Sequence, residues 1–220
     1  MNLTPQQLLE SVPDLADWKD AERWLKSCPE IVSCEQFMSL EWNDIEEHVQ
    51  SSFGLHASEH WRKFVLSTFA ADLISYPKLS DQVDFARLLY VMHAFPKGFR
   101  VWWVKADDGS WWPVGYTGWY PMLDYQFAIF EKSPELIKDR TVVPNVHRPA
   151  NPFLYLFSYS VAPALKKTLL SRTLIKRFVD DIHAQDFGGL ACITVSEEGA
   201  SVAKKFGMTY AGNEVYALRV

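Results

Sequence analysis

The chain has 220 residues, of which 48% are hydrophobic and 22% are charged, and this is the composition of an ordinary globular protein. The formal net charge is −5, which excludes a general nucleic-acid binder, because neutralising phosphates requires a basic surface. No stretch approaches the roughly 20 apolar residues of a membrane span, and residues 1–15 lack the pattern of a signal peptide. We therefore expect a soluble, cytoplasmic protein with no membrane span and no nucleic-acid partner.

Three cysteines fit a reducing compartment better than a disulfide framework. Cys28 and Cys34 are close in sequence, but no second Cys/His pair lies at the spacing of zinc ligands, so no metal site is expected. Nine tryptophans leave two interpretations open, an aromatic core or an aromatic-lined groove for an apolar substrate.

Residues 1–96 have helical patterns and are predicted to form a helical N-terminal region. The strongest signal follows Ser58, where apolar residues recur at helical spacing up to Pro77. A further helix is expected to be capped by Ser80 and to stop at Pro96. The helices are predicted to begin near Thr4, Asp20, Glu35, Ser58 and Ser80.

After Pro96 the pattern changes to strand formers. Residues 99–104 and 111–116 are rich in aromatic residues, and Asp107-Asp108-Gly109 between them is a turn signal. This arrangement predicts a β-hairpin, with its tryptophans packed across the two strands. We predict a further strand at residues 123–130.

The next segment, residues 134–152, is predicted to contain a short helix and then a loop. Residues 134–139 are the predicted helix. Three prolines within residues 141–152 predict the loop, because proline lacks an amide donor and restricts the residue before it. His147 lies in this loop and is a candidate general base, although a loop histidine is also an ordinary surface residue.

The C-terminal part has a regular alternation of strand and helix patterns. Residues 153–161 form an apolar and aromatic run that suits a central strand. Its two serines, Ser158 and Ser160, are interpreted as groups that close hydrogen bonds within the sheet, or one of them as a group that donates to a carbonyl or binds a water. The elements that follow are a helix at 169–185, a buried strand at 190–195, a short helix at 197–206 and a terminal strand or hairpin at 210–220.

This order of elements resembles the GNAT acyltransferases. In that family a strand ending in Val-x-Pro leads into a loop of the pattern R/Q-x-x-G-x-G/A and then into a long helix. Here Val161-Ala162-Pro163 matches the end of the strand, and residues 166–171, Lys-Lys-Thr-Leu-Leu-Ser, occupy the loop. Residues 205–208, Lys-Phe-Gly-Met, stand where the family has a Gly-Phe pair. The resemblance covers residues 153–220 and implies an α+β fold, a GNAT-like mixed β-sheet flanked by helices.

The resemblance implies that this loop binds the phosphates of acetyl-CoA or another acyl-CoA at a helix N-terminus. Two glycine positions of the family's loop are Leu169 and Ser171 here, and Leu169 is expected to crowd the approach of the phosphates. Ala203 stands where many members carry a tyrosine general acid, and Ser196 stands where an asparagine is frequent. The implied cofactor-binding residues are Ser160, Val161, Lys166, Lys167, Thr168, Leu169, Leu170, Ser171 and Arg172.

One feature of the charge pattern supports an anion site independently of the resemblance. Residues 163–177 contain five basic residues and no acidic one, in a chain that is acidic as a whole. Cations near a helix N-terminus oppose the macrodipole, so these residues are interpreted either as an anion site or as a solvated basic helix face. The five residues are Lys166, Lys167, Arg172, Lys176 and Arg177.

From these patterns we predict a helical region at residues 1–96 and a GNAT-like acyltransferase domain at residues 97–220. The resemblance implies a transfer of an acetyl or longer acyl group from a thioester of coenzyme A or a carrier protein to a small-molecule or protein amine. The alternative is a catalytically inactive GNAT-like fold that binds a protein or an anion. A further alternative is that the helical region and the tryptophans form an acceptor interface or the interface of a homo-oligomer.

Overall fold

The computed structural model of the protein describes residues 59–76, 81–105, 111–147 and 149–220, and the side chains of these residues except at a few positions in helices and strands. The chain divides into two compact units, residues 1–116 with 160–171 and residues 117–159 with 172–220. The helices predicted before Ser58, the Cys28/Cys34 pair and the turn at 107–109 lie outside the described residues. Among the helices that are described, none has the length and apolar character needed to cross a membrane.

The first unit contains the two helices that were predicted after Ser58 and Ser80. Helix α4 spans Glu59–Ser75 and buries several polar residues, of which Thr68 and Ser75 donate to backbone carbonyls four residues earlier in the helix. Helix α5 spans Phe85–Ala94, so it begins later than predicted. Its N-cap is Asp84 and not Ser80, because the Asp84 carboxylate accepts the Arg87 amide at 3.0 Å.

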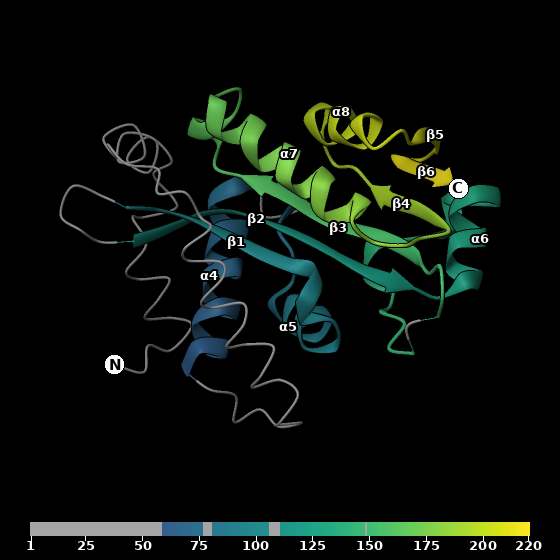
Figure 1. The fold of residues 1–220 in the computed structure, drawn as a ribbon, viewed down its shortest axis with the longest axis horizontal. Coiled ribbons are helices and arrows are strands. Elements are labelled where there is room, and N and C mark those ends of the chain that lie inside the picture. The colour runs from purple at the N-terminus through teal and green to yellow at the C-terminus, as the bar shows by residue number, and fades with distance from the viewer. Residues whose placement is uncertain (1–58, 77–80, 106–110, 148) are drawn as a thin grey trace. The chain divides into compact units, whose positions relative to one another are not determined.

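The described part of the chain contains a six-stranded mixed sheet with the order β1-β2-β3-β4-β6-β5. Strands β3 and β4 are parallel, and the pairs β4–β6 and β6–β5 are antiparallel. Figure 1 shows this arrangement. The strands are β1 (Phe99–Lys105), β2 (Trp111–Met122), β3 (Phe153–Val161), β4 (Gly189–Ile193), β5 (Thr209–Gly212) and β6 (Val215–Arg219). The strands predicted at 99–104, 111–116, 153–161 and 190–195 are therefore present, although β2 continues to Met122 and β4 ends at Ile193.

Helices α7 (Leu169–His183) and α8 (Glu197–Lys205) lie over β3 and β4 in Figure 1. Phe178 of α7 stacks on Tyr159 of β3, with ring centroids 6.2 Å apart, and meets Phe206 edge-on at 5.3 Å. Phe178 is buried together with Leu174 and Ile182, so the four-residue spacing predicted for this helix is its core face. The α+β fold with a mixed sheet flanked by helices is thus confirmed.

The strand predicted at residues 123–130 is wrong, because this segment is helix α6, Asp124–Lys132. Its buried residues, Gln126, Phe127 and Phe130, have helical spacing, and Tyr125 is 62% exposed. The Gln126 amide bridges two backbone groups, donating to the Thr141 carbonyl and accepting from the Val143 amide. The short helix predicted at 134–139 is replaced by two 3₁₀ turns, Pro134–Leu136 and Asp139–Thr141.

Cys192 on β4 is buried, and its Sγ lies 3.7 Å from the Met208 sulfur. Burial raises the pKa of Cys192 to about 12, so at pH 8 only about one thiol in ten thousand is ionised. We expect iodoacetamide at pH 8 to leave Cys192 unmodified in the native protein and to alkylate it in denaturant. Peptide mapping by mass spectrometry separates Cys192 from the other two cysteines, and rapid native alkylation of Cys192 would contradict its position in the core.

Candidate functional site

The carboxyl end of β3 is fixed to β2 by close backbone packing. Ser160 is buried, and its hydroxyl accepts the Tyr116 amide at 3.2 Å and lies 3.4 Å from the Tyr116 carbonyl oxygen, to which it donates. The Ala162 amide donates to the Val114 carbonyl at 2.7 Å. Gly115 faces this end of β3, and a Cβ atom there would lie 2.5 Å from the Ser160 carbonyl oxygen. The start of the predicted site is therefore rigidly placed.

Tyr116 is tied in turn to a buried carboxylate on α4. Its hydroxyl donates to Asp72 Oδ1 at 2.8 Å, and the Val83 amide donates to Asp72 Oδ2, also at 2.8 Å. Asp72 is 1% exposed. Sequence reasoning missed this contact, although an acid within the apolar face of a predicted helix is a usable signal of a buried hydrogen-bonded carboxylate.

The loop after β3 is a compact turn that leads directly into α7. A 3₁₀ turn, Pro163–Leu165, follows Ala162, and Leu165 is buried. Lys166 and Lys167 come next and are both exposed. Lys167 has φ of +64°, a left-handed conformation that is uncommon for a residue with a side chain. The turn thus projects two consecutive lysines into solvent just before the helix begins.

Thr168 closes this turn and caps α7. Its hydroxyl donates to the Leu165 carbonyl at 2.6 Å and accepts the Ser171 amide at 3.4 Å. The Ser171 hydroxyl donates back to the Thr168 carbonyl at 3.0 Å, and Ser171 is 5% exposed. The capping threonine and the buried serine fix the loop to the first turn of the helix.

Leu169 is the first residue of α7, and its side chain is 80% exposed. The Leu169 side chain points into solvent and does not fill the loop. That Leu169 crowds the approach of the phosphates stays a prediction. Leu170 follows in the same turn. Ser171, at the family's second glycine position, is small and buried.

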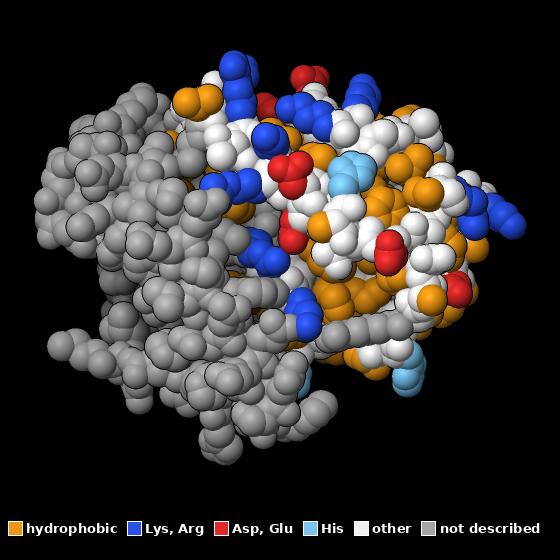
Figure 2. Space-filling model, viewed as in Figure 1, with side chains coloured by type: hydrophobic (Ala, Val, Ile, Leu, Met, Phe, Trp, Pro, Cys, Tyr) orange, Lys and Arg blue, Asp and Glu red, His pale blue; other side chains and the backbone are white. Residues whose placement is uncertain are grey.

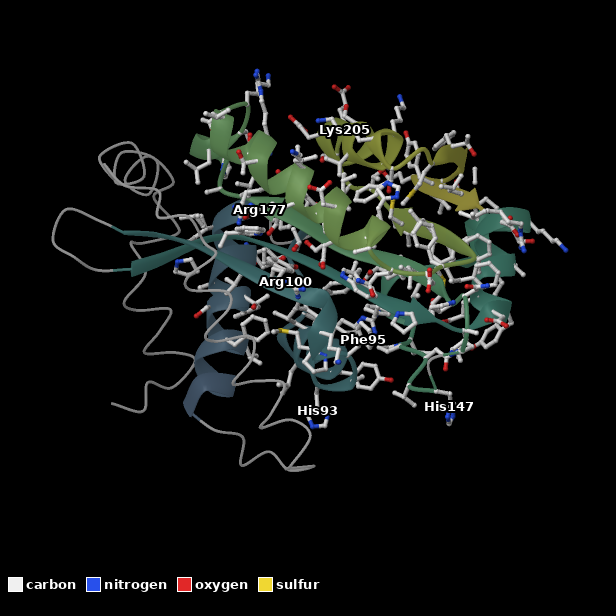
Figure 3. All side chains as sticks on the ribbon, in the orientation of Figure 1. His93, Phe95, Arg100, His147, Arg177 and Lys205 are labelled. Carbon is white, nitrogen blue, oxygen red and sulfur yellow. The ribbon has the colours of Figure 1, made fainter. Side chains whose placement is uncertain are left out.

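The basic residues of this segment are mostly solvent-exposed. Lys166, Lys167, Arg172 and Lys176 are exposed, and Arg177 is half-buried. Lys and Arg side chains gather over α7 in the space-filling view (Figure 2), and Figure 3 labels Arg177 on this helix. The N-terminal half of α7 therefore presents cations where the helix macrodipole disfavours them.

Strands β3 and β4 separate before β3 ends. Their parallel ladder has three pairs, of which the last is Tyr155 with Ala191. β3 continues to Val161, whereas β4 ends at Ile193 and is paired with β6 along its whole length. Among the strands that the structure describes, none pairs with the β4-facing edge of β3 beyond Tyr155.

The pKa values of two tyrosines of β3, Tyr155 and Tyr159, are raised. The Tyr155 hydroxyl donates to Asp139 Oδ1 at 2.6 Å, and its burial and the neighbouring Asp139 raise the pKa of Tyr155 well above its usual value. Burial likewise raises the pKa of Tyr159. Both phenols are therefore neutral at physiological pH and can act there as hydrogen-bond donors but not as phenolate bases. The sequence contains no local signal for the contact of Tyr155 with Asp139.

His147 lies at the amino end of β3, the end opposite to Val161. The Asn145 amide donates to the Pro121 carbonyl at 2.6 Å, and the His147 amide donates to Asn145 Oδ1 at 3.1 Å. These contacts hold the loop beside the last residues of β2. The imidazole is exposed and projects away from the sheet (Figure 3). An acid–base role for His147 stays a prediction.

At two positions, Ala203 in α8 and its N-cap Ser196, this chain lacks the tyrosine and the asparagine that are frequent in the family. Neither residue is an acid or a base. Ala203 is 2% exposed in the core, and the Ser196 hydroxyl caps α8 by accepting the Gly199 amide at 3.1 Å. Within the described residues, no group of three or more His, Cys, Asp or Glu side chains is placed to hold a metal ion. The described part of the site thus contains exposed cations, a capped N-terminus of α7 and the edge of β3 beyond its ladder with β4.

No family model and no curated protein matches the sequence. Several solved structures are similar to it. The loading GNATL domain of CurA from Lyngbya majuscula is 14% identical, with a TM-score of 0.43 over 63% of this chain and 64% of that one. The GphF GNAT-like decarboxylase in complex with isobutyryl-CoA is 17% identical, with a TM-score of 0.40 over 64% of this chain and 66% of that one. AtaTR bound with acetyl-CoA is 10% identical, with a TM-score of 0.36 over 69% and 86% of the two chains.

The class of fold follows from the chain's own elements. From β3 onward these are a strand, a capped loop, a long helix, a parallel strand, a short helix and an antiparallel hairpin. This is the order that the resemblance to the acyltransferases implies. The described part of the chain therefore has a GNAT-like fold.

Proposed function

We propose that this protein is an N-acyltransferase that moves an acetyl or longer acyl group from a coenzyme A thioester to an amine, with residues 97–220 as its transferase domain. The observation that carries the proposal is the exposed, acid-free cationic segment that joins the end of β3 to the first turn of α7. Cations placed against a helix macrodipole are stabilised when an anion binds beside them. A pyrophosphate is an anion of suitable charge for this segment.

In this proposal the donor's phosphates bind at the loop, and its arm runs along β3. Lys166, Lys167 and Arg172 supply side-chain cations, and the backbone of residues 168–171 lies at the helix N-terminus. Ser160 and Val161 form the strand end that holds the loop in place. The residues fit such a ligand because the Leu169 side chain, which is 80% exposed, extends into solvent.

The free edge of β3 suits the amide-containing arm of the donor. Beyond Tyr155 no strand of the described residues pairs with this edge, although β3 continues to Val161. An extended chain of amides can pair with such an edge as an added strand does. The thioester would then be held along β3, with its phosphates at the loop.

The reaction itself requires two proton transfers. The amine nitrogen attacks the thioester carbonyl, the carbon–sulfur bond breaks, and the amine loses a proton while the departing thiolate gains one. Ala203 cannot supply the acid, so a group elsewhere or the solvent protonates the sulfur. We propose His147 as a candidate base, subject to the test below.

A second function is favoured by Ala203 in α8 and by Ser196, the N-cap residue of this helix. Buried Ala203 and the capping Ser196 leave the family's usual polar groups absent, as expected of a GNAT-like fold that binds an anion or a protein without catalysis. The cationic segment would serve this function equally well. The two functions therefore differ in turnover and not in ligand binding.

Acyl transfer is tested with the full chain, acetyl-CoA and separate pools of small amines and lysine-containing peptides. Mass spectrometry of the pools detects the acylated product. We expect a product that grows with enzyme concentration and with pH, because only the neutral amine attacks. A His147→Gln variant of unchanged activity would remove His147 from the mechanism. Saturable binding of acetyl-CoA without any product would favour the non-catalytic function.

A further inference from the structure

The first turns of α7 carry an exposed leucine among exposed cations. Leu169 begins the helix, and its side chain is 80% exposed. Arg172 and Lys176 follow it by three and seven positions, a spacing that places all three on one helix face, and both cations are exposed. With Lys166 and Lys167, which are exposed in the turn before the helix, these residues form the α7 surface. An apolar side chain ringed by cations suits a partner that is acidic and partly apolar.

The charge of the chain is divided unevenly along its length. Residues 1–58 contain 11 acidic and 3 basic residues, a formal net charge of −8. Residues 59–220 contain 16 acidic and 19 basic residues, a formal net charge of +3. Opposite charges attract over the distance that the salt concentration allows, and a tether between them keeps the two parts within reach. An acidic partner for the α7 surface is therefore present in the same chain.

One segment of residues 1–58 matches the α7 surface in both charge and apolar character. Residues 27–58 contain six acidic residues and no Lys or Arg. Four of these acids fall within residues 41–47, Glu-Trp-Asn-Asp-Ile-Glu-Glu. In the helix that the sequence predicts from Glu35 onward, Trp42 and Ile45 are three positions apart and share one face. The segment thus offers apolar side chains for Leu169 and carboxylates for the surrounding cations.

We propose that residues 41–47 dock on the α7 surface of the same chain, with Trp42 and Ile45 against Leu169 and the carboxylates beside the cations. Glu47 is 12 positions before Glu59, where α4 begins, and a chain of that length spans up to roughly 40 Å. A tethered segment meets its site at an effective concentration of about a millimolar, so contacts that are weak one by one are sufficient. The docked segment is an internal anion that occupies the cations until another anion displaces it.

Zero-length crosslinking of the full chain tests the docking directly. A carbodiimide joins a lysine amine to a carboxylate only where the two are in contact, and peptide mapping by mass spectrometry identifies the pair. We expect Lys166 and Lys167 to be joined to residues 41–47 at low salt, with a yield that falls as salt rises. Lys204 and Lys205, exposed in the last turn of α8, are the internal control and should give a severalfold lower yield. Equal yields at the two lysine pairs would overturn the docking.

Leu169→Ser tests the apolar part of the contact, because it leaves every reacting amine and carboxylate in place. We expect it to lower the yield of crosslinks from Lys166 and Lys167 severalfold. The matched control is Val146→Ser, since Val146 is 60% exposed in a loop outside α7, and its yield should equal that of the wild type. An unchanged yield in Leu169→Ser would overturn the docking as proposed.

A mixture of isotopically labelled and unlabelled chains shows which chain supplies the segment. Crosslinks within one chain join peptides of the same isotope. Crosslinks that join labelled to unlabelled peptides would assign the docked segment to a second copy of the chain, and they would overturn docking within one chain.

Neutralising the segment should raise the affinity for acetyl-CoA, because the docking does not require the proposed function but competes with a donor that uses the same cations. The variant combines Glu41→Gln, Asp44→Asn, Glu46→Gln and Glu47→Gln. We expect it to bind acetyl-CoA roughly three- to tenfold more tightly, as follows if the segment occupies the cations for about two thirds to nine tenths of the time. Saturating acetyl-CoA should likewise suppress the crosslinks of the wild type, and binding that leaves them unchanged would overturn the displacement.

The matched control neutralises four other acidic residues of the same region and changes the net charge equally. These residues are Asp14, Asp17, Asp20 and Glu22. The control should bind acetyl-CoA as the wild type does. An equal gain in both variants would show an effect of net charge alone and would overturn the assignment to residues 41–47.

The outcomes keep this proposal apart from the proposed function. If the wild type binds acetyl-CoA and forms no crosslinks between Lys166 or Lys167 and residues 41–47, the docking is overturned and the proposed function stands. If these crosslinks form and acetyl-CoA does not bind, the docking stands and the proposed function loses its donor site. If neither crosslinks nor binding are found, both proposals fail together.

Discussion

Replacing Lys166, Lys167 and Arg172 together with glutamate should weaken acetyl-CoA binding by about three orders of magnitude or more, at about 1.4 kcal/mol for each tenfold change. Charge-assisted hydrogen bonds contribute about 1.5–3 kcal/mol each, and three such contacts are lost and replaced by repulsion. All three side chains are exposed, so the change does not disturb the core. The measurement is isothermal titration calorimetry of the variant and the wild type at matched salt.

This variant should remain folded, which makes its loss of binding interpretable. Acidic residues near a helix N-terminus interact favourably with the macrodipole by about 0.3–1 kcal/mol each, so the reversal should not lower the melting temperature. The matched control is Lys204→Glu with Lys205→Glu, two exposed residues in the last turn of α8. Equal affinity in the triple variant and the wild type would remove these three residues from the donor site.

Gly115→Ala should lower the free energy of unfolding by about 1–3 kcal/mol, the usual cost of overpacking a core. The added Cβ would lie 2.5 Å from the Ser160 carbonyl oxygen and 3.0 Å from the Val161 Cα, both of them backbone atoms. The junction of β2 and β3 must therefore move to accept it. Urea denaturation followed by circular dichroism measures the change.

Gly199→Ala is the matched control for this substitution. Its Cβ would meet the Ser196 hydroxyl and the Thr194 side chain at 3.4 Å, which is ordinary contact, and Gly199 lies within α8. Alanine in a helix interior is favoured over glycine by about 0.5–1 kcal/mol, so this variant should be slightly more stable than the wild type. If Gly115→Ala were as stable as Gly199→Ala, the close approach of β2 to the end of β3 would be refuted.

Elements with one dominant pattern could be predicted from the sequence. The spacing of Leu174, Phe178 and Ile182 predicts α7, and the unbroken apolar run of residues 153–161 predicts β3. The strand prediction for residues 123–130 was wrong because the apolar residues of this segment also alternate. They occupy every second position, at Leu123, Tyr125, Phe127 and Ile129. In the structure Tyr125 is exposed and Phe130 is buried, which follows the helical period and not the alternation.

The candidate site was only partly predictable, for a different reason. The loop and its cations are local in sequence, so the chain order correctly placed residues 166–172 at the end of the loop after β3 and in the first turn of α7. The pairing of Ser160 depends on Tyr116, which is 44 residues away. Likewise, the contact of Tyr116 with Asp72 joins two residues that no local pattern relates. Such contacts are set by how the strands and helices meet.

Calorimetric titration of the wild-type protein with acetyl-CoA, at low and at moderate salt, tests the central claim most directly. The proposed donor site predicts saturable binding of one ligand per chain, with an affinity that falls as salt rises because the phosphates meet exposed cations. Free coenzyme A should bind in the same way, since it has the same phosphates. The absence of binding of either ligand at millimolar concentration would contradict the proposed donor site and the function built on it.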